Sequence, residues 1–396
     1  MIYRKFLADR LFNGYKMLEH PSVLVTRADG VIEDLLSPED AGDDVEVVSG
    51  ILSPGFVNCH CHLELSHLKG LIPEKTGLTD FVFSVVTQRH FPAEVINAAI
   101  KDGEEEMFRN GTVAVGDICN NAHTLQRKKN GRLQYYNFIE LSGWSPGVAA
   151  TRFAAGKSLY EEFAAFSPSG RHLSISPHAP YSVSDELWTM IRPYYAGKTA
   201  TLHNQETPAE DELFKTGKGD FLRMYQLMNI DNSFFHPPGI SSLQASLPRL
   251  EGAENILLVH NTFTREEDLQ FLDAISKQSS VNIFCCLCIR ANLFIENAVP
   301  PVELFRENAI DLVLGTDSLA SNHSLNLLDE MRTLQHHFPS LSLEEMLPWA
   351  TLNGASALQM DAELGSFEEG KRPGVVLIED LQGGKITADS RVKRLV

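Results

Sequence analysis

Residues 54–62 read Pro-Gly-Phe-Val-Asn-Cys-His-Cys-His, a short apolar run that ends in two histidines. Such a run predicts a β-strand. Side chains two apart on a strand point to the same face, so His60 and His62 face one way while Cys59 and Cys61 face the other. Two imidazoles at one strand end are a natural pair of metal ligands, and a polar strand edge is the alternative interpretation. The two cysteines are predicted to pack in the core.

Seven further short apolar runs follow, separated by stretches long enough for a helix. The eight predicted strands are residues 55–61, 112–118, 133–141, 173–176, 199–202, 255–259, 281–286 and 312–314. Strands that alternate with helices form parallel sheets. Eight such units predict an α/β fold, a (β/α)8 TIM barrel, in which the chemistry lies at the C-terminal ends of the strands.

Both ends of the chain show short strand and turn signals in place of the alternating strands and helices. Residues 1–52 contain strand candidates at 22–26 and 45–48 and a hairpin-type turn at Asp29-Gly30. Residues 365–396 are rich in glycine turns around another strand candidate. We therefore expect the termini to pair in one small flanking β-sandwich domain, built from residues 1–52 and 365–396. Residues 53–364 would then form the barrel.

Histidine or aspartate follows several other predicted strands. His203, His260 and Asp317 each lie where such a strand ends. Because these ends meet at one face of a barrel, we expect the three side chains to converge with His60 and His62. A single strand-end histidine is more often a hydrogen-bonded structural residue. Several imidazoles and a carboxylate that converge on one point predict a metal site.

The composition excludes several classes of protein. The chain has 396 residues, of which 43% are hydrophobic and 22% charged, so a large core can form. A net charge of −18 opposes binding to phosphate backbones and anionic lipid, so we expect neither a nucleic-acid nor a membrane partner. No apolar stretch is long enough to span a membrane, and the N-terminus lacks the apolar core of a signal peptide. Six cysteines then predict reduced thiols and a cytoplasmic location.

The order of these histidines and the aspartate, with their flanking motifs, resembles the amidohydrolase superfamily. The flanks are Pro-Gly-Phe-Val-Asn at 54–58, Pro-His-Ala-Pro-Tyr-Ser at 177–182 and Gly-Thr-Asp-Ser-Leu-Ala-Ser-Asn at 315–322. They are similar to the branch that holds the nucleoside, purine and cytosine deaminases and the chlorohydrolases. The resemblance covers residues from about 50 to 360.

The resemblance implies one divalent metal ion, held by His60, His62, His203 and Asp317. Binuclear members of the superfamily use a bridging lysine or glutamate from the fourth strand, and residues 174–178 read Ser-Ile-Ser-Pro-His instead. Zinc is the first expectation because it favours imidazole and carboxylate ligands and leaves a position open for water. Fe(II) is the alternative.

Roles for further residues follow from the same resemblance. Asp317 would take the proton of the water, Glu206 would protonate the ring nitrogen, and His260 would contact and orient the water. The expected substrate contacts are Glu64, His178, Tyr181 and Arg290. Glu64 lies in a His-Leu-Glu-x-Ser motif that resembles the aminodeoxyfutalosine deaminases.

We therefore predict a metal-dependent hydrolase of carbon–nitrogen bonds other than peptide bonds. The expected reaction is hydrolytic deamination of an aminated heterocycle, such as a purine nucleoside derivative or aminodeoxyfutalosine. A chlorohydrolase or a cyclic amidohydrolase that uses the same activated water is the alternative within this class. A non-catalytic barrel scaffold is the alternative outside it. The expected partners are a small heterocyclic substrate and a second copy of the chain, as a homodimer.

Overall fold

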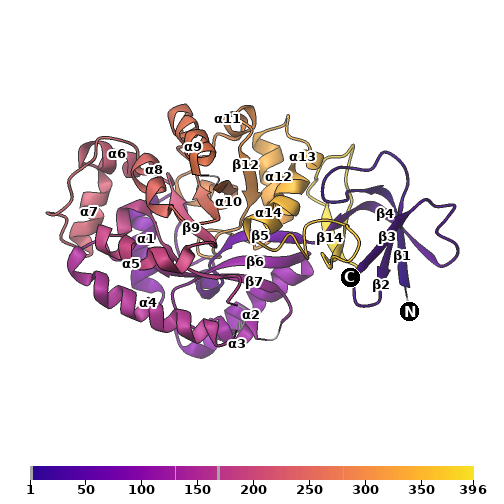
Figure 1. Cartoon of the computed structure of the whole chain (residues 1–396), viewed down its shortest axis with the longest axis horizontal. Helices are drawn as coiled ribbons and strands as arrows, with labels where there is room; N and C mark the ends of the chain where they lie inside the picture. Colours follow the sequence, from indigo (N-terminus) through magenta and orange to yellow (C-terminus); the bar gives the residue numbers. More distant parts are fainter. Residues whose placement is uncertain (1–2, 130, 167–169, 280) are drawn as a thin grey trace.

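The computed structural model describes residues 3–129, 131–166, 170–279 and 281–396. Figure 1 shows a large lobe of alternating strands and helices and a smaller, strand-rich lobe that holds both ends of the chain. Residues 1–2 of the predicted flanking domain lie outside the described residues. Within the described residues, no helix has both the length and the apolar character that crossing a membrane requires.

Eight parallel strands form the centre of the large lobe, as two four-stranded sheets. The first sheet has the order β5-β6-β7-β8 and the second has the order β12-β11-β10-β9. The strands are β5 (Phe56–Cys61), β6 (Thr112–Cys119), β7 (Gln134–Leu141), β8 (Leu173–Pro177), β9 (Thr199–Asn204), β10 (Asn255–His260), β11 (Asn282–Leu287) and β12 (Asp311–Leu314). Each predicted strand is confirmed to within two residues. Every residue of β5, β6, β8, β9 and β10 is buried, which explains their continuous apolar runs.

Hydrogen bonds at the strand ends connect the two sheets. The amide of His203 on β9 donates to the carbonyl of His178 after β8 (2.9 Å), and the amide of Thr316 after β12 donates to the carbonyl of His60 on β5 (3.0 Å). The side chains of Asn58 and Thr316 add a bond of 2.7 Å. The C-terminal ends of the two sheets are therefore held together at both seams.

Helices and short 3₁₀ turns connect the strands and cover them. The α-helices are α1 (Leu78–Gln88), α2 (Ala93–Arg109), α3 (Leu125–Lys128), α4 (Ala149–Ala164), α5 (Asp185–Tyr195), α6 (Pro208–Thr216), α7 (Asp220–Leu227), α8 (Ser242–Ser246), α9 (Glu266–Ser279), α10 (Ile289–Ile295), α11 (Val302–Glu307), α12 (Leu327–His337), α13 (Leu343–Ala350) and α14 (Leu352–Ala357). The 3₁₀ turns are η1 (Leu63–Leu68), η2 (Pro146–Val148), η3 (Pro180–Ser182) and η4 (Leu247–Leu250). Local sequence signals set the first residues of several helices. Ser342 caps α13 in a capping box with Glu345, for example.

The small lobe is built on one six-stranded sheet of order β14-β13-β4-β1-β2-β3. Its strands are β1 (Tyr3–Leu11), β2 (Val23–Arg27), β3 (Ile32–Leu36), β4 (Val45–Pro54), β13 (Val375–Glu379) and β14 (Arg391–Arg394). Both termini pair in it, as predicted, and the turn at Asp29-Gly30 joins β2 to β3. The strand ladders of the described residues form a single sheet here, so the sandwich stays a prediction.

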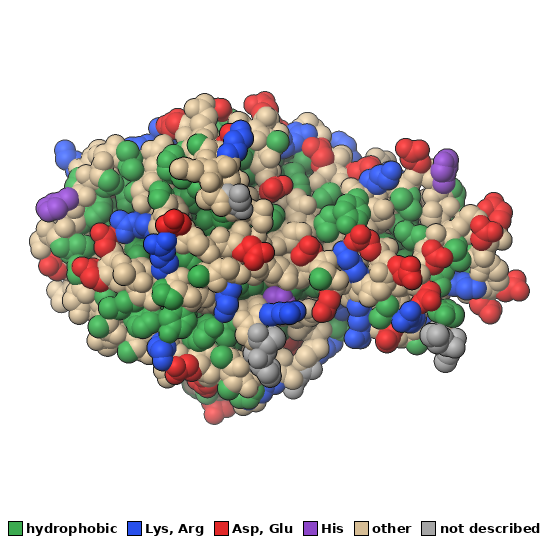
Figure 2. All heavy atoms as spheres, viewed as in Figure 1, with side chains coloured by type: hydrophobic (Ala, Val, Ile, Leu, Met, Phe, Trp, Pro, Cys, Tyr) green, Lys and Arg blue, Asp and Glu red, His purple; other side chains and the backbone are tan. Residues whose placement is uncertain are grey.

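Charged side chains cover the outside of both lobes. Figure 2 shows acidic groups gathered over the far end of the small lobe. The loop before β4 supplies four exposed carboxylates in six residues, namely Glu39, Asp40, Asp43 and Asp44. Much of the negative charge thus lies away from the strand ends of the large lobe.

A buried ion pair braces the connection after β5. Lys128 pairs with Asp117 on β6, and both side chains are almost fully buried. The second oxygen of Asp117 accepts the amide of Leu63, the residue that follows His62 (2.9 Å). The pair therefore supports the backbone that carries two of the predicted metal ligands.

We expect Lys128→Met to lower the stability by about 3–5 kcal/mol, because it leaves the buried carboxylate of Asp117 without its cation. The melting temperature measured by circular dichroism checks this. Lys157→Met is the matched control, since Lys157 forms an exposed pair with Glu161, and it should melt with the wild-type chain. Equal melting temperatures for the two variants would contradict the role of the buried pair.

Candidate functional site

The predicted metal ligands all lie at the C-terminal ends of the parallel strands. His60 is the second-to-last residue of β5, and His62 directly follows that strand. His203 is the second-to-last residue of β9. Asp317 comes three residues after β12. All four side chains are buried, with at most 8% exposure. This is the face of a parallel α/β fold where active sites are built.

The nitrogen and oxygen atoms of these residues converge closely. The Nε2 atom of His62 lies 3.1 Å from that of His60 and 3.3 Å from that of His203. The Oδ1 atom of Asp317 lies 3.4 Å from Nε2 of His62 and 3.5 Å from Nε2 of His60. The Nε2 atom of His62 therefore lies within 3.4 Å of one donor atom each from His60, His203 and Asp317, which come from three separate parts of the chain.

This donor set fits a divalent metal ion. A neutral imidazole carries one N–H, so three ring nitrogens that face one another cannot all be satisfied by hydrogen bonds among themselves. Ligand atoms about 2.0–2.1 Å from a zinc ion in tetrahedral geometry lie roughly 3.3–3.4 Å apart. Burial lowers the pKa of His62 and, further, that of His203, so both rings are in the neutral form that binds metal.

Hydrogen bonds fix the orientation of two rings. The Nδ1 atom of His203 donates to the carbonyl of His178 at 2.8 Å, so its Nε2 lone pair points into the cluster. The Nδ1 atom of His260 lies 2.9 Å from Oδ1 of Asn292, which fixes that ring in the same way. These bonds select the tautomer in which Nε2 is free to act as ligand or acceptor.

The backbone around Asp317 is unusual and explains how its carboxylate reaches the cluster. Asp317 has a φ of 56°, its amide donates to the carbonyl of His60, and its Oδ2 accepts the hydroxyl of Ser321 at 2.5 Å. Gly315 makes this path possible, because a Cβ there would lie 2.9 Å from Cβ of His60. Burial opposes ionisation of Asp317, but the hydrogen bond from His60 and the nearby rings of His62 and His260 lower its pKa below the usual range.

Glu206 and His260 form a second pair beside the cluster. The Oε1 atom of Glu206 lies 3.5 Å from Nε2 of His260, and both residues are at least 97% buried. Burial, with repulsion from Asp317 and Glu210, raises the pKa of Glu206 well above its usual range. Burial lowers the pKa of His260 to about 4. A protonated carboxyl and a neutral imidazole at neutral pH suit proton transfer.

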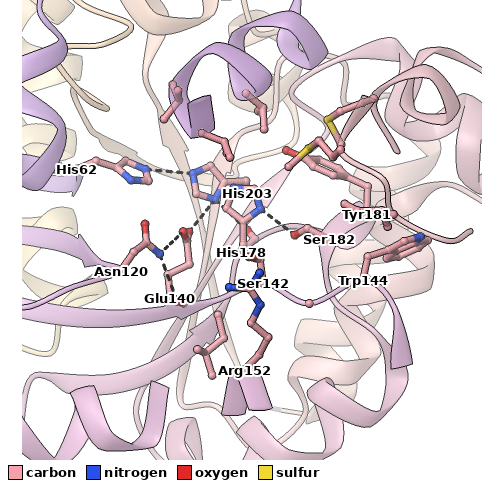
Figure 3. A pocket seen from close by; sticks show the side chains of 18 of the residues that line it. His62, Asn120, Glu140, Ser142, Trp144, Arg152, His178, Tyr181, Ser182 and His203 are labelled. Carbon is pink, nitrogen blue, oxygen red and sulfur yellow. Dashed lines mark hydrogen bonds and ion pairs between the residues drawn. The ribbon is translucent and has the colours of Figure 1, made fainter. Parts of the chain in front are cut away.

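These residues open into a cavity of about 550 Å³. Its walls come from α1, α4, the loop after β7, η3 and α7, and its floor holds His62, His203, Glu206, His260 and Asp317. Figure 3 shows His62, His178 and His203 at the inner end and Trp144 and Arg152 on the walls. A cavity of this size holds a ligand larger than a single heterocyclic ring.

The predicted substrate contacts divide into two groups. His178 and Tyr181 line the cavity. Glu64 and Arg290 are not among the lining residues: Glu64 accepts the amides of Asn120 and Asn121, and Arg290 donates to Asn322. Burial raises the pKa of Glu64 to about 8. Their roles in substrate binding stay predictions.

Several lining residues were not predicted from the sequence. Glu140, Asn120, Trp144 and Arg152 line the cavity. Glu140 is on β7, next to the end of a predicted strand, so the strand-end rule that found the histidines could have found it. Trp144 and Arg152 lie on connecting segments, and no motif marks them.

Comparisons with known proteins agree with this geometry. The model of the amidohydrolase family matches residues 51–392. Adenosine deaminase from Helicobacter pylori is 26% identical over 82% of this chain and 78% of its own length. Aminodeoxyfutalosine deaminase from a Nitratiruptor species is 24% identical over 85% of this chain and 80% of its own length.

The crystal structure of aminofutalosine deaminase from Helicobacter pylori has the same fold. It superposes with a TM-score of 0.82 and 23% identity, over the full length of both chains. The family model covers well over half of this chain, and the buried histidines and aspartate lie at the strand ends where a metal-dependent hydrolase needs them. The chain therefore belongs to the amidohydrolase family.

Proposed function

We propose that this chain catalyses the hydrolytic deamination of an adenosine-like nucleoside, with aminodeoxyfutalosine as one candidate. The observation that carries the proposal is the buried Glu206 beside the cluster of His60, His62, His203 and Asp317. Glu206 and three of these residues, His62, His203 and Asp317, line one cavity. Deamination of an aromatic amidine needs a nucleophilic water and a proton donor to the ring, and these groups can provide both. The names of the related deaminases support the same reaction.

One divalent ion, Zn²⁺ or else Fe²⁺, is proposed at the cluster, held by His60, His62, His203 and Asp317. When bound, such an ion lowers the pKa of water and so supplies a nucleophile at neutral pH. The imidazole and carboxylate donors and their separations of 3.1–3.5 Å support this assignment.

The proton transfers are assigned to the residues of this chain. Asp317 accepts a proton from the attacking water, because its lowered pKa keeps it ionised and its carboxylate lies at the inner end of the cavity. Glu206, kept protonated by burial, gives its proton to the ring nitrogen next to the attacked carbon. His260 accepts a hydrogen bond at Nε2 and orients the water. Asp317 then passes the proton it took from the water to the amino group, and the C–N bond breaks with loss of ammonia. The remaining hydroxyl proton returns to Glu206 as the ring carbon becomes a carbonyl, and the ring nitrogen keeps the proton it received.

His178 and Tyr181 are proposed to contact the heterocycle. The ring of His178 lies 4.7 Å from that of His203, measured between centroids, and 5.8 Å from that of Tyr181. Tyr181 in turn stacks on Phe221 at 4.1 Å. These aromatic surfaces form a wall against which a planar base can pack.

The finer architecture is also part of the proposal. The two four-stranded sheets are proposed to form one closed (β/α)8 barrel over residues 53–364, supported by the hydrogen bonds at both seams. Residues 1–52 and 365–396 are proposed as the flanking domain, supported by the sheet that pairs both termini. A cytoplasmic homodimer without nucleic-acid or membrane partners is consistent with the net charge of −18.

We expect Glu206→Gln to retain the metal content of the wild-type chain and to lose about 10²–10⁴-fold in turnover, because the ligands stay while the proton donor is removed. Ammonia release and elemental analysis of the same sample check both parts. Glu212→Gln, on an exposed position of α6, is the control and should keep its activity. Turnover that persists in Glu206→Gln would remove this residue from the mechanism.

The leaving group separates deamination from the alternative hydrolyses. We expect ammonia from adenosine derivatives and no chloride from chlorinated triazines, because Glu206 provides the ring protonation that an amine substituent needs. Parallel assays of ammonia, chloride and ring opening measure this. Chloride or a ring-opened product as the main outcome would replace the proposed reaction with one of its alternatives.

A further inference from the structure

Glu140 is a buried carboxylate that the proposed mechanism does not use. It lies on β7 next to the strand end, is 7% exposed, and lines the cavity beside His203. Figure 3 shows it between Asn120 and His203 at the inner end of the cavity. Its position is therefore close to the metal cluster but separate from the proton donor, Glu206.

The two oxygens of this carboxylate differ. Oε2 accepts the side-chain amide of Asn120 at 3.0 Å. Oε1 lies 3.4 Å from Nδ1 of His203, but that nitrogen already gives its single proton to the carbonyl of His178 at 2.8 Å. Oε1 is therefore buried without a hydrogen-bond donor from the described residues. A buried acceptor left unpaired is costly, so a donor from a ligand is the natural partner.

The surroundings hold Glu140 in this position. Glu64 accepts the backbone amides of Asn120 and Asn121 at 3.1 and 3.2 Å, and Asn120 in turn holds Glu140. Glu64 thus acts on the cavity through Asn120. Arg152 also lines the cavity, but Oε1 of Glu140 has no hydrogen-bond partner among the described residues, so Arg152 does not occupy it.

We propose that Glu140 accepts hydrogen bonds from the sugar hydroxyls of a nucleoside substrate and so selects nucleosides over free bases. The inference rests on the proposed deaminase function and names its substrate class. Glu140 lines the same cavity as His62, His203 and Asp317, and the cavity volume of about 550 Å³ has room for a sugar beside the heterocycle. The hydroxyls of a sugar are hydrogen-bond donors of the kind that the unpaired Oε1 can accept.

The test compares adenosine with 2′,3′-dideoxyadenosine in the metal-loaded enzyme. The wild-type chain should prefer adenosine by roughly 100-fold or more in kcat/KM, since the dideoxy compound leaves Oε1 unpaired. Glu140→Leu should bring the ratio close to one, and Glu140→Gln should give an intermediate ratio. Glu104→Gln is the matched control: Glu104 is a buried carboxylate on α2 that pairs with Arg127 and does not line the cavity, so the ratio should stay near the wild-type value. Circular dichroism and metal content confirm that each variant is folded.

Two outcomes would overturn the inference. One is a wild-type ratio near one, and the other is a ratio that persists in Glu140→Leu as it does in Glu104→Gln. Binding of inosine and 2′,3′-dideoxyinosine by calorimetry tests the same hydroxyls without turnover. The proposed reaction fails if neither adenosine nor 2′,3′-dideoxyadenosine is deaminated. The sugar site still stands if inosine binds more tightly than 2′,3′-dideoxyinosine and this difference disappears in Glu140→Leu. If inosine and its dideoxy form bind equally, the sugar site fails.

Discussion

The convergence of four buried donor atoms is the constraint on which the rest of the site depends. Nε2 of His62 lies 3.1–3.4 Å from Nε2 of His60, Nε2 of His203 and Oδ1 of Asp317, and all four side chains are buried. The chain itself provides too few protons to satisfy them, so a cation is what makes the arrangement favourable. The lowered pKa values of His62, His203 and Asp317 and the raised pKa of Glu206 are all consistent with that requirement.

The scaffold holds these donors together by short connections between strands that are distant in sequence. Asn58 both donates to the hydroxyl of Thr316 and accepts its amide, at 2.7 and 3.1 Å, and so ties β5 to the segment that carries Asp317. Gly315 lets this segment pass close to His60. Lys128 and Asp117 brace the other side, after His62. A substitution at any of these contacts would affect the site indirectly, because it would shift one of the side chains proposed to bind the metal.

The sequence was sufficient to predict the alternation of strands and helices and the residues at the strand ends. Apolar runs and strand-end positions are local properties, and the topology of parallel sheets converts them into spatial neighbours. This is why His203 and Asp317, separated by more than a hundred residues, could be placed together. The pairing of both termini in one sheet also followed from local turn and strand signals.

Side-chain direction and loop packing could not be predicted in the same way. Glu64 follows His62 closely, yet it turns away to hold Asn120, whereas Glu140 faces the cavity. Arg290 lies in the first turn of α10, where Asn322 and Glu330 hold its side chain, and it does not line the cavity. The cavity walls from α1 and α4 depend on how helices pack across the strand ends, which no short motif encodes.

The metal content of the purified chain tests the central claim most directly. Elemental analysis should find close to one zinc or iron ion per chain, and a folded His203→Asn variant should hold much less, because one of the four donors is removed. Two ions per chain would contradict a single site at the cluster. A folded, active chain with no bound metal, or a His203→Asn variant that keeps its full content, would contradict the assignment of the ligands.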